Sequence, residues 1–196
     1  MDNKYKQENN NLWQKCKSGN KSAFQEIYYQ CINDLFAYGC AILPDEDVVK
    51  EQIQELFIYI WDKKDHLNIT DIKPYLIKSL KRKLYKYCKG NKNYTLDIDY
   101  LEANANELVE DANELVEDPN DIDYHEMEIK RDALHKLIES LPTKQKEIIY
   151  LRYFTGLKPH EIADIMEINA QSVYNLLSRS LKNIEKKLTN KNHINE

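Results

Sequence analysis

The sequence predicts an all-α protein made of two small helical domains joined by an acidic, flexible linker. Three observations support this prediction. The 196 residues include only 4 Gly and 5 Pro, and alternating β-branched residues are scarce. Apolar residues recur at helical spacing towards both ends of the chain. Between them, residues 97–128 hold 13 acidic residues and no Lys or Arg, a composition that disfavours a packed core. We place the domains at residues 1–92 and 128–196, and the linker at residues 93–127.

Helix boundary signals divide the first domain. A break at residues 18–20 separates a short first helix from a second one that begins at Ser22. After Pro44, the acidic run at residues 45–47 begins a third helix, because carboxylates are favourable at a helix N-terminus. The apolar stripe of this third helix is formed by Val49, Ile53, Leu56 and Ile60.

Three polar residues of the third helix, Glu51, Gln54 and Glu55, fall away from its apolar stripe. Taken alone, they would be an ordinary solvated face of a surface helix. Their position on an otherwise buried helix also makes them candidates for contact with a partner.

The stretch from residue 72 to 92 is basic and carries interleaved aromatic residues. Residues 72–96 contain 8 Lys and Arg and no acid, although the whole chain has a net charge of -5. We expect five basic side chains to face outward: Lys78, Lys81, Arg82, Lys86 and Lys89. Charges that track phosphates and rings that stack on bases suit single-stranded DNA. For this helix taken alone, a solvated lysine face is the simpler interpretation.

The linker contains the same seven residues twice, at 105–111 and 112–118. A seven-residue repeat is typical of coiled coils, but two copies with one apolar pair each are too few to form one. The excess of acidic residues favours an extended or weakly ordered segment.

The C-terminal domain has the plan of a helix-turn-helix. Thr143 is placed to cap a helix that ends at Gly156, and Pro159 suits the first turn of a short second helix. Residues 167–169 can form a turn before a long amphipathic helix that begins at Ala170. Ala163 is small enough to let these last two helices cross closely. A plain helical bundle with a tight turn is the alternative.

A recognition helix presents its N-terminal residues to base edges, so we expect Gln171, Ser172 and Asn175 to read bases. Arg179 and Lys182 are expected to face phosphates. Because Gln and Asn can each pair in two places with adenine, the sequence predicts a site that contains adenine.

Two stretches of the chain resemble one protein family. The C-terminal domain (region 4) of bacterial extracytoplasmic-function (ECF) sigma factors is similar to the run LPTKQKEIIYLRYFTGLKPHEIADIMEINAQSVYNLLSRSLKNIEKKL. Region 2 of the same family is similar to GNKSAFQEIYYQCINDLFAYG followed by EQIQELFIYIW. The two domains stand in the order that the family has.

The resemblance implies an alternative sigma factor that joins core RNA polymerase and directs promoter-specific initiation of transcription, with no catalysis of its own. The implied partners are core polymerase (the clamp helices of its largest subunit, and its flap), promoter DNA, and an anti-sigma factor or another recruiting protein. By the same resemblance, Glu51, Gln54 and Glu55 would contact the clamp. The basic helix and the loop at residues 62–73 would open the upstream promoter element and hold an unstacked base. The acidic linker would thread the polymerase cleft, or serve only as a tether.

The chain departs from the family at positions that contact DNA. Arg82 and Lys86 stand where relatives usually carry Asn and Asp, which leaves the base preference open. Tyr174, counted here among the DNA-binding residues, and Leu176 stand where relatives often carry Lys and Arg, and Glu167 replaces the turn glycine. Because each lost phosphate contact weakens binding, we expect the isolated C-terminal domain to bind duplex DNA weakly.

A free-standing helix-turn-helix transcriptional regulator is the second hypothesis, but it would need a sensing or dimerising domain. An enzyme is not expected, because the five histidines share no spacing with carboxylates or thiols and no phosphate-binding glycine loop exists. The four cysteines show no CxxC spacing, which favours reduced thiols, and we expect no cofactor and no metal. No stretch resembles a signal peptide or a membrane span, so the sequence predicts a cytoplasmic bacterial protein without membrane insertion.

Overall fold

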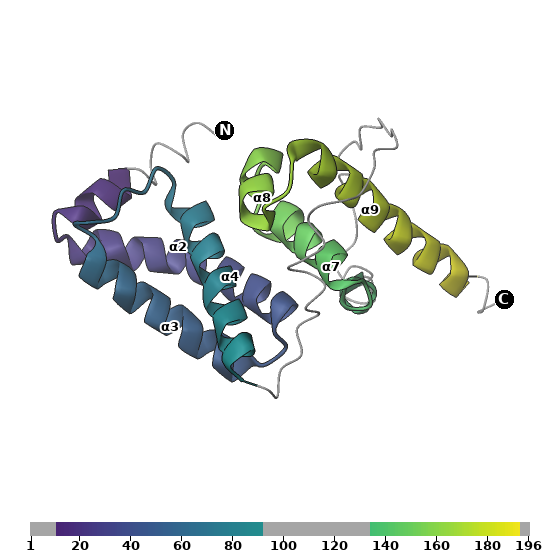
Figure 1. Ribbon diagram of the computed structural model, residues 1–196, viewed down its shortest axis with the longest axis horizontal. Coiled ribbons are helices and arrows are strands. Elements are labelled where there is room, and N and C mark those ends of the chain that lie inside the picture. The colour runs from purple at the N-terminus through teal and green to yellow at the C-terminus, as the bar shows by residue number, and fades with distance from the viewer. Residues whose placement is uncertain (1–10, 92–133, 193–196) are drawn as a thin grey trace, which may run out of the picture. The chain divides into compact units, whose positions relative to one another are not determined.

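The computed structural model describes residues 11–91 and 134–192 of the chain. It divides into two compact units, one that contains residues 11–91 and one that contains residues 134–192 (Figure 1). All regular structure in the described ranges is helical, which confirms the predicted all-α class. The linker predicted at residues 93–127, with its duplicated heptapeptide, lies outside the described residues. None of the described helices combines the length and the apolar character needed to span a lipid bilayer.

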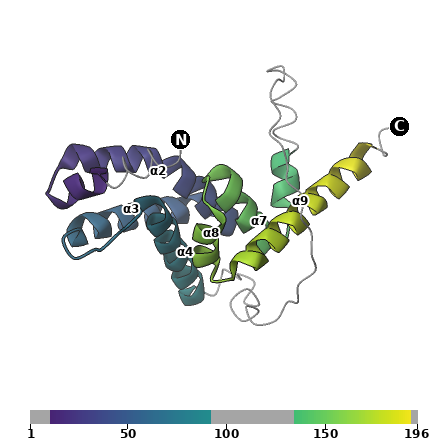
Figure 2. The same ribbon diagram turned by 90° about the horizontal axis from the view of Figure 1, so that it is seen from above.

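Three long helices form the first unit, and each packs against the other two (Figure 2). They are α2 (Lys21–Ile42), α3 (Glu46–Lys63) and α4 (Ile72–Gly90). Residues 11–17 are also helical. Side-chain caps fix two of the helix starts, since Asn20 Oδ1 accepts from the Ala23 N–H at 3.0 Å and Asp45 Oδ1 accepts from the Val48 N–H at 3.1 Å.

The α2–α3 crossing depends on one glycine. A Cβ at Gly39 would lie 2.5 Å from Cγ1 of Val49, a fully buried residue of α3. Glycine inside a helix is unfavourable by about 1 kcal/mol relative to alanine. Here its missing side chain lets the two helices approach, so packing overrides helix propensity.

The second unit contains the predicted helix-turn-helix. Its helices are α7 (Thr143–Ile149), the π-helical segment η2 (Tyr150–Phe154), α8 (Pro159–Met166) and α9 (Ala170–Asn192). Residues 134–139 are helical as well. The α7–η2 segment reaches Thr155, whose N–H donates to the Tyr150 carbonyl at 3.0 Å, and Gly156 follows with φ of 69°.

The predicted cap at Thr143 is wrong. Thr143 is the first helical residue, and Pro142 occupies the N-cap position without a side-chain cap. The fixed φ of proline suits the start of a helix. The Pro142 carbonyl accepts the first helical hydrogen bond, from the Lys146 N–H at 2.9 Å, so the helix begins one residue after the proline.

The turn between α8 and α9 uses a left-handed residue and a side-chain cap. Glu167 has φ of 57°, a conformation that favours glycine, and the Ile168 N–H closes α8 by donating to the Ala163 carbonyl at 3.1 Å. Asn169 Oδ1 then accepts from the Ser172 N–H at 2.7 Å. Residue 167 turns the chain, and Asn169 starts α9.

Candidate nucleic-acid and protein interfaces

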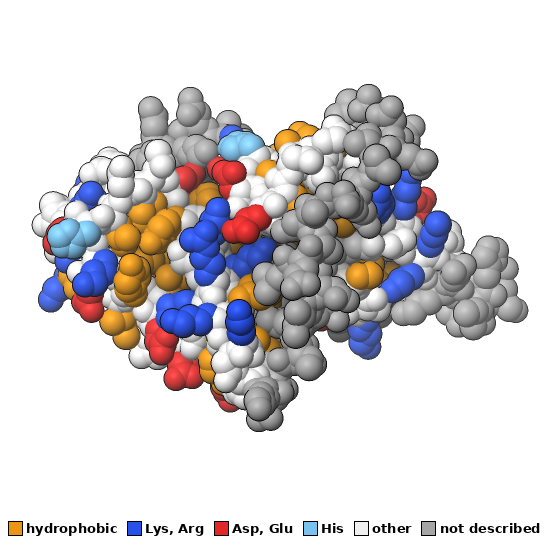
Figure 3. Space-filling model, in the orientation of Figure 1, with side chains coloured by type: hydrophobic (Ala, Val, Ile, Leu, Met, Phe, Trp, Pro, Cys, Tyr) orange, Lys and Arg blue, Asp and Glu red, His pale blue; other side chains and the backbone are white. Residues whose placement is uncertain are grey.

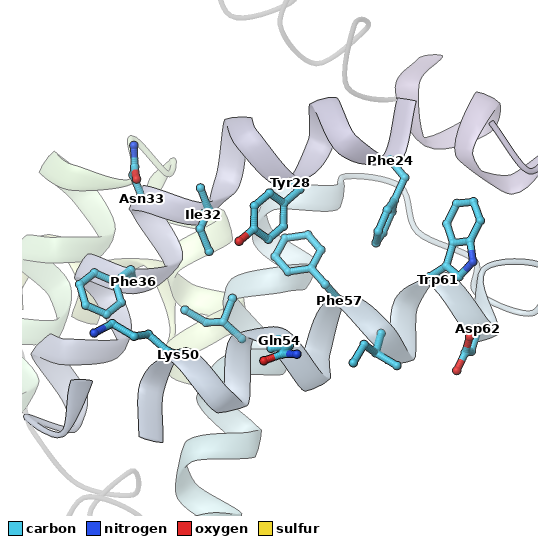
Figure 4. Close-up of a pocket in the computed structure, with 12 residues that line it drawn as sticks. Phe24, Tyr28, Ile32, Asn33, Phe36, Lys50, Gln54, Phe57, Trp61 and Asp62 are labelled. Carbon is cyan, nitrogen blue, oxygen red and sulfur yellow. The ribbon is translucent and has the colours of Figure 1, made fainter. Parts of the chain in front are cut away.

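The three α3 residues predicted to bind a partner are all exposed, and they face different neighbours. Glu55 Oε2 accepts a hydrogen bond from Lys83 Nζ of α4 at 2.7 Å. Gln54 instead faces α2, where it lines a groove (Figure 4). Glu51 is one helical turn before Glu55 and shares its edge. Glu51 lies between the other two on the helix surface, three residues before Gln54 and four before Glu55, so the three residues form one polar strip from the groove to the α4 side of α3.

An apolar groove of about 660 Å³ runs between α2 and α3, and we call it the α2–α3 groove. Its walls are mainly aromatic and aliphatic side chains spaced three or four residues apart on the two helices: Phe24, Tyr28, Ile32, Phe36, Ile53, Phe57, Ile58 and Trp61. Figure 3 shows apolar side chains between α2 and α3 at the surface of this unit. Polar residues also line the groove: Asn33, Lys50, Gln54 and Asp62.

Ring contacts hold the groove in shape. The Phe24 ring lies 5.0 Å from that of Trp61, and the Tyr28 ring lies 4.9 Å from that of Phe57, measured between centroids. Apolar surface remains open to solvent, because Ile58 is 54% exposed and Tyr28 is 36% exposed. A contiguous apolar surface with a polar rim is typical of protein-binding sites.

Lys50 contributes positive charge beside the groove. Its Nζ lies 3.2 Å from Glu46 Oε2 and 5.5 Å from the centroid of the Phe36 ring. The hydrogen bond to Glu46 raises the pKa of Lys50 above its usual value. The ammonium group stays charged beside an aromatic wall.

The basic face of α4 is narrower than the sequence predicts. Arg82, Lys86 and Lys89 are exposed and Lys78 is half-buried, so these four form one stripe along the helix. Figure 3 shows Lys and Arg side chains gathered over α4. We call these four residues the basic stripe.

The prediction that Lys81 faces outward is wrong, because this residue is only 9% exposed. It follows Ile77 by four residues and precedes Leu84 by three, so it lies on the buried face of α4. Its ammonium group reaches the Tyr85 ring, 5.8 Å from the centroid. The aliphatic stem is buried while the charge sits against an aromatic face.

Aromatic side chains accompany the basic stripe. Tyr75 is half-buried and hydrogen-bonds Ser79, and burial raises its pKa. Tyr59 of α3 and Arg82 are near enough to affect this pKa as well, and Tyr59 is 47% exposed. Rings and cations therefore share one surface, as single-stranded DNA binding requires.

The predicted reading residues lie at the start of α9. Gln171, Tyr174, Arg179 and Lys182 are exposed, and Tyr174 is exposed by 56%. Ser172 and Asn175 are half-buried. These residues share the outer side of the helix, because Val173, Ser180 and Ile184 are buried against the rest of the unit.

Two of the residues predicted to contact base edges also contact each other. Gln171 Nε2 donates a hydrogen bond to Asn175 Oδ1 at 3.2 Å, one helical turn further along α9. The side-chain oxygen of Asn169 accepts a hydrogen bond from the Ser172 N–H and so caps the helix. The start of α9 thus presents an ordered amide pair beside the exposed Tyr174.

The described residues hold no cluster suited to a metal ion, since no three His, Cys, Asp or Glu side chains gather there. All four cysteines are free thiols, and Cys16, Cys31 and Cys88 are buried. Burial raises the pKa of Cys31 to about 12, which keeps it protonated and unreactive at neutral pH.

Sequence analysis missed the α2–α3 groove and Lys83. The spacing of Phe24, Tyr28, Ile32 and Phe36 at every fourth residue was the available signal for one wall of the groove. Lys83 gave no such signal, because its partner Glu55 is 28 residues away along the chain.

The second unit matches a known protein family. Residues 131–184 match the family described as Sigma-70, region 4. ECF RNA polymerase sigma factor SigM of Bacillus subtilis (strain 168) is 25% identical over 161 residues, which are 82% of this chain and 91% of SigM. RNA polymerase sigma factor SigV of the same organism is 42% identical over 60 residues, or 31% of this chain and 36% of SigV.

Solved structures share the fold. CnrH in complex with the cytosolic domain of CnrY matches with a TM-score of 0.61 and 16% identity, over 93% of this chain and 97% of that chain. The sigma factor RpoE in complex with the anti-sigma factor NepR from Bartonella quintana matches with a TM-score of 0.57 and 16% identity, over 85% and 96%. The region 4 match coincides with the helix-turn-helix, and the likeness to SigM covers most of both chains, so this protein is similar to ECF sigma factors of the sigma-70 family along most of its length.

Proposed function

We propose that this protein is an alternative sigma factor, which binds core RNA polymerase through the α2–α3 groove and the neighbouring acidic edge of α3. It would contact promoter DNA through α4 and α9. The observation that carries the proposal is the presence, on one chain, of an open aromatic groove in one unit and a helix-turn-helix in the other. Promoter selection requires both a protein-docking surface and a DNA-reading surface. Polymerase supplies the catalysis, in the cytoplasm.

The groove supports docking of helices from a partner protein. Aromatic residues dominate binding energy in protein interfaces, and Tyr28, Phe57 and Trp61 are grouped on its walls. Glu51 and Glu55 add negative charge beside it, which favours a basic partner surface and speeds association. On this view Gln54 lies inside the interface and the two acids lie at its rim.

The two DNA contacts differ in kind. The basic stripe of α4, with Tyr59 and Tyr75 beside it, suits unstacked bases and phosphates of an opened strand. The start of α9 suits base edges of duplex DNA, with Arg179 and Lys182 further along the helix near phosphates. Contact with both opened and duplex DNA is what initiation of transcription requires.

An anti-sigma factor is the further partner that we propose. Two proteins of the same fold, CnrH and RpoE, were solved in complexes, the latter with the anti-sigma factor NepR. An inhibitor seated in the α2–α3 groove would exclude polymerase from the same aromatic residues.

A free-standing regulator is less well supported. It would account for the helix-turn-helix, but it leaves the α2–α3 groove without a role. The likeness to SigM extends over 82% of the chain, so it reaches well beyond the helix-turn-helix.

Affinity for core polymerase tests the proposal. Ile58→Lys places a charge on the exposed rim of the groove, and Gln30→Lys adds the same charge at an exposed position of α2 that does not line it. We expect Ile58→Lys to weaken binding of labelled full-length protein to core polymerase at least about tenfold, as for loss of an interface hot spot, and Gln30→Lys to leave it unchanged. Equal affinities for the two variants would contradict docking in the groove.

A further inference from the structure

Gln171 and Asn175 are joined by a direct hydrogen bond on the exposed start of α9, with 3.2 Å between Nε2 and Oδ1. We infer that these two amides read duplex DNA as one hydrogen-bonded unit that spans two neighbouring base pairs. This inference rests on the proposed entry of α9 into the major groove. It goes further by replacing two independent readers with a coupled pair.

The hydrogen bond sets what each amide can offer to DNA. It uses one N–H of Gln171 and one lone pair of Asn175. Gln171 keeps its Oε1 acceptor and one N–H, and Asn175 keeps both Nδ2 donors and one lone pair of Oδ1. Because the bond joins Nε2 to Oδ1, the pair has the acceptor Oε1 at its Gln171 end and the donor Nδ2 at its Asn175 end.

This order predicts a preferred dinucleotide step. In the major groove, an acceptor pairs with the amino group of adenine or cytosine, while a donor pairs with purine N7, guanine O6 or thymine O4. Residues four apart on a helix are about 5–6 Å apart between their Cβ atoms, somewhat more than the spacing of about 3.4 Å between neighbouring bases. Adenine or cytosine next to a base with an exposed acceptor satisfies both ends.

The neighbouring residues do not replace Gln171 and Asn175 as the amides that read base edges. Asn169 Oδ1 accepts from the Ser172 N–H at 2.7 Å, so this oxygen is already used to cap α9. Tyr174 is exposed beside the pair and carries no amide. Each partner orders the other before DNA binds, which lowers the side-chain entropy lost on binding.

If Gln171 and Asn175 act as a hydrogen-bonded pair, substituting one of them should affect the base contact of the other. Removing either amide frees the other, so a single substitution should alter the base preference at both positions of the step. A second substitution should then add little. Lys182 is seven residues beyond Asn175 on the same helix, and its loss should weaken binding to all sequences alike.

The test uses holoenzyme assembled from the full-length chain and core polymerase, bound to a duplex library randomised over the promoter element that α9 is proposed to contact. Wild type, Gln171→Ala, Asn175→Ala, the double variant and Lys182→Ala are compared by sequencing the bound fraction. Circular dichroism checks that each variant is folded, as expected for substitutions outside the core.

We expect each single variant to lose about tenfold of the discrimination at two adjacent positions, the size of a good base contact, and the double variant to lose hardly more. Lys182→Ala should lower affinity without changing the base preference. Losses confined to one position for each variant, and additive in the double variant, would overturn the pair while the proposed function stands. Absence of any base preference in the wild-type holoenzyme would overturn the DNA contact of α9 together with the pair.

Discussion

Lys83 Nζ of α4 lies 2.7 Å from Glu55 Oε2 of α3, which joins the helix proposed to bind polymerase to the helix proposed to bind opened DNA. The Glu55 side chain is 52% exposed and the Lys83 side chain is 29% exposed. An ion pair this exposed stabilises a fold by only about 0–1 kcal/mol. Glu55 therefore remains available to a partner that offers it a better-placed cation.

Glu55 pairs with Lys83 and is proposed to contact polymerase. Reversing its charge, with and without reversing the charge of Lys83, separates these two roles. Glu55→Lys places two lysines together and should weaken polymerase binding at least about tenfold, because charge complementarity at the rim is lost. The double variant Glu55→Lys/Lys83→Glu re-forms the ion pair within the unit. We expect the swap to restore the free energy of unfolding, measured in urea, but not the affinity for core polymerase. If the swap restores both, Glu55 has only a structural role.

Lys81 and Arg82 are neighbours with opposite exposure, and they should respond differently to substitution. Lys81→Met keeps the buried aliphatic stem and removes a charge directed at Tyr85, so we expect little change in promoter opening. Arg82→Ala removes an exposed cation of the basic stripe and should reduce the salt dependence of DNA binding by about one unit of slope. Salt titrations of open-complex formation by holoenzyme measure both effects. A larger effect from Lys81→Met would place that ammonium group on DNA.

Gly39→Ala should destabilise the first unit despite the better helix propensity of alanine. The added Cβ would meet Val49 Cγ1 at 2.5 Å, and a β-branched side chain in a helix has little freedom to move away. Overpacking of this kind costs about 1–3 kcal/mol, against a gain of about 1 kcal/mol in propensity. Urea unfolding of the full chain checks the sign.

Gly90 provides the matched control. It is also a helical glycine, but a Cβ there has no neighbour within 4 Å. Gly90→Ala should be neutral or stabilising. If the two alanine variants behave alike, close α2–α3 contact is not the reason for Gly39.

Local chemistry was enough to predict most helix boundaries. Pro44 with its following acids placed the start of α3, and Pro159 and the turn at residues 167–169 placed α8 and α9. Each of these signals involves residues within one helical turn of each other, so it can be recognised from the amino-acid sequence alone. The η2 segment gave no comparable signal, because nothing between Tyr150 and Phe154 requires a π-helix locally.

Tertiary packing decided what the sequence did not show. Lys81 is buried because α4 packs against both α2 and α3, which makes its buried face wider than a single apolar stripe. The α2–α3 groove depends on the spacing of two helices, and the hydrogen bond between Gln171 and Asn175 depends on the rotamers that both side chains adopt. Contacts within a helix and between helices therefore refined the candidate sites beyond what residue type and spacing could indicate.

Transcription in vitro tests the central claim most directly. Core polymerase, alone or with the full-length chain, transcribes fragmented genomic DNA from the source organism, and the 5′ ends of the RNA are mapped. We predict new start sites that appear only with the chain, share one two-part upstream sequence, and are lost with Ile58→Lys but not with Gln30→Lys. An unchanged set of start sites, with the chain bound to DNA in the absence of polymerase, would contradict the account and favour a free-standing regulator.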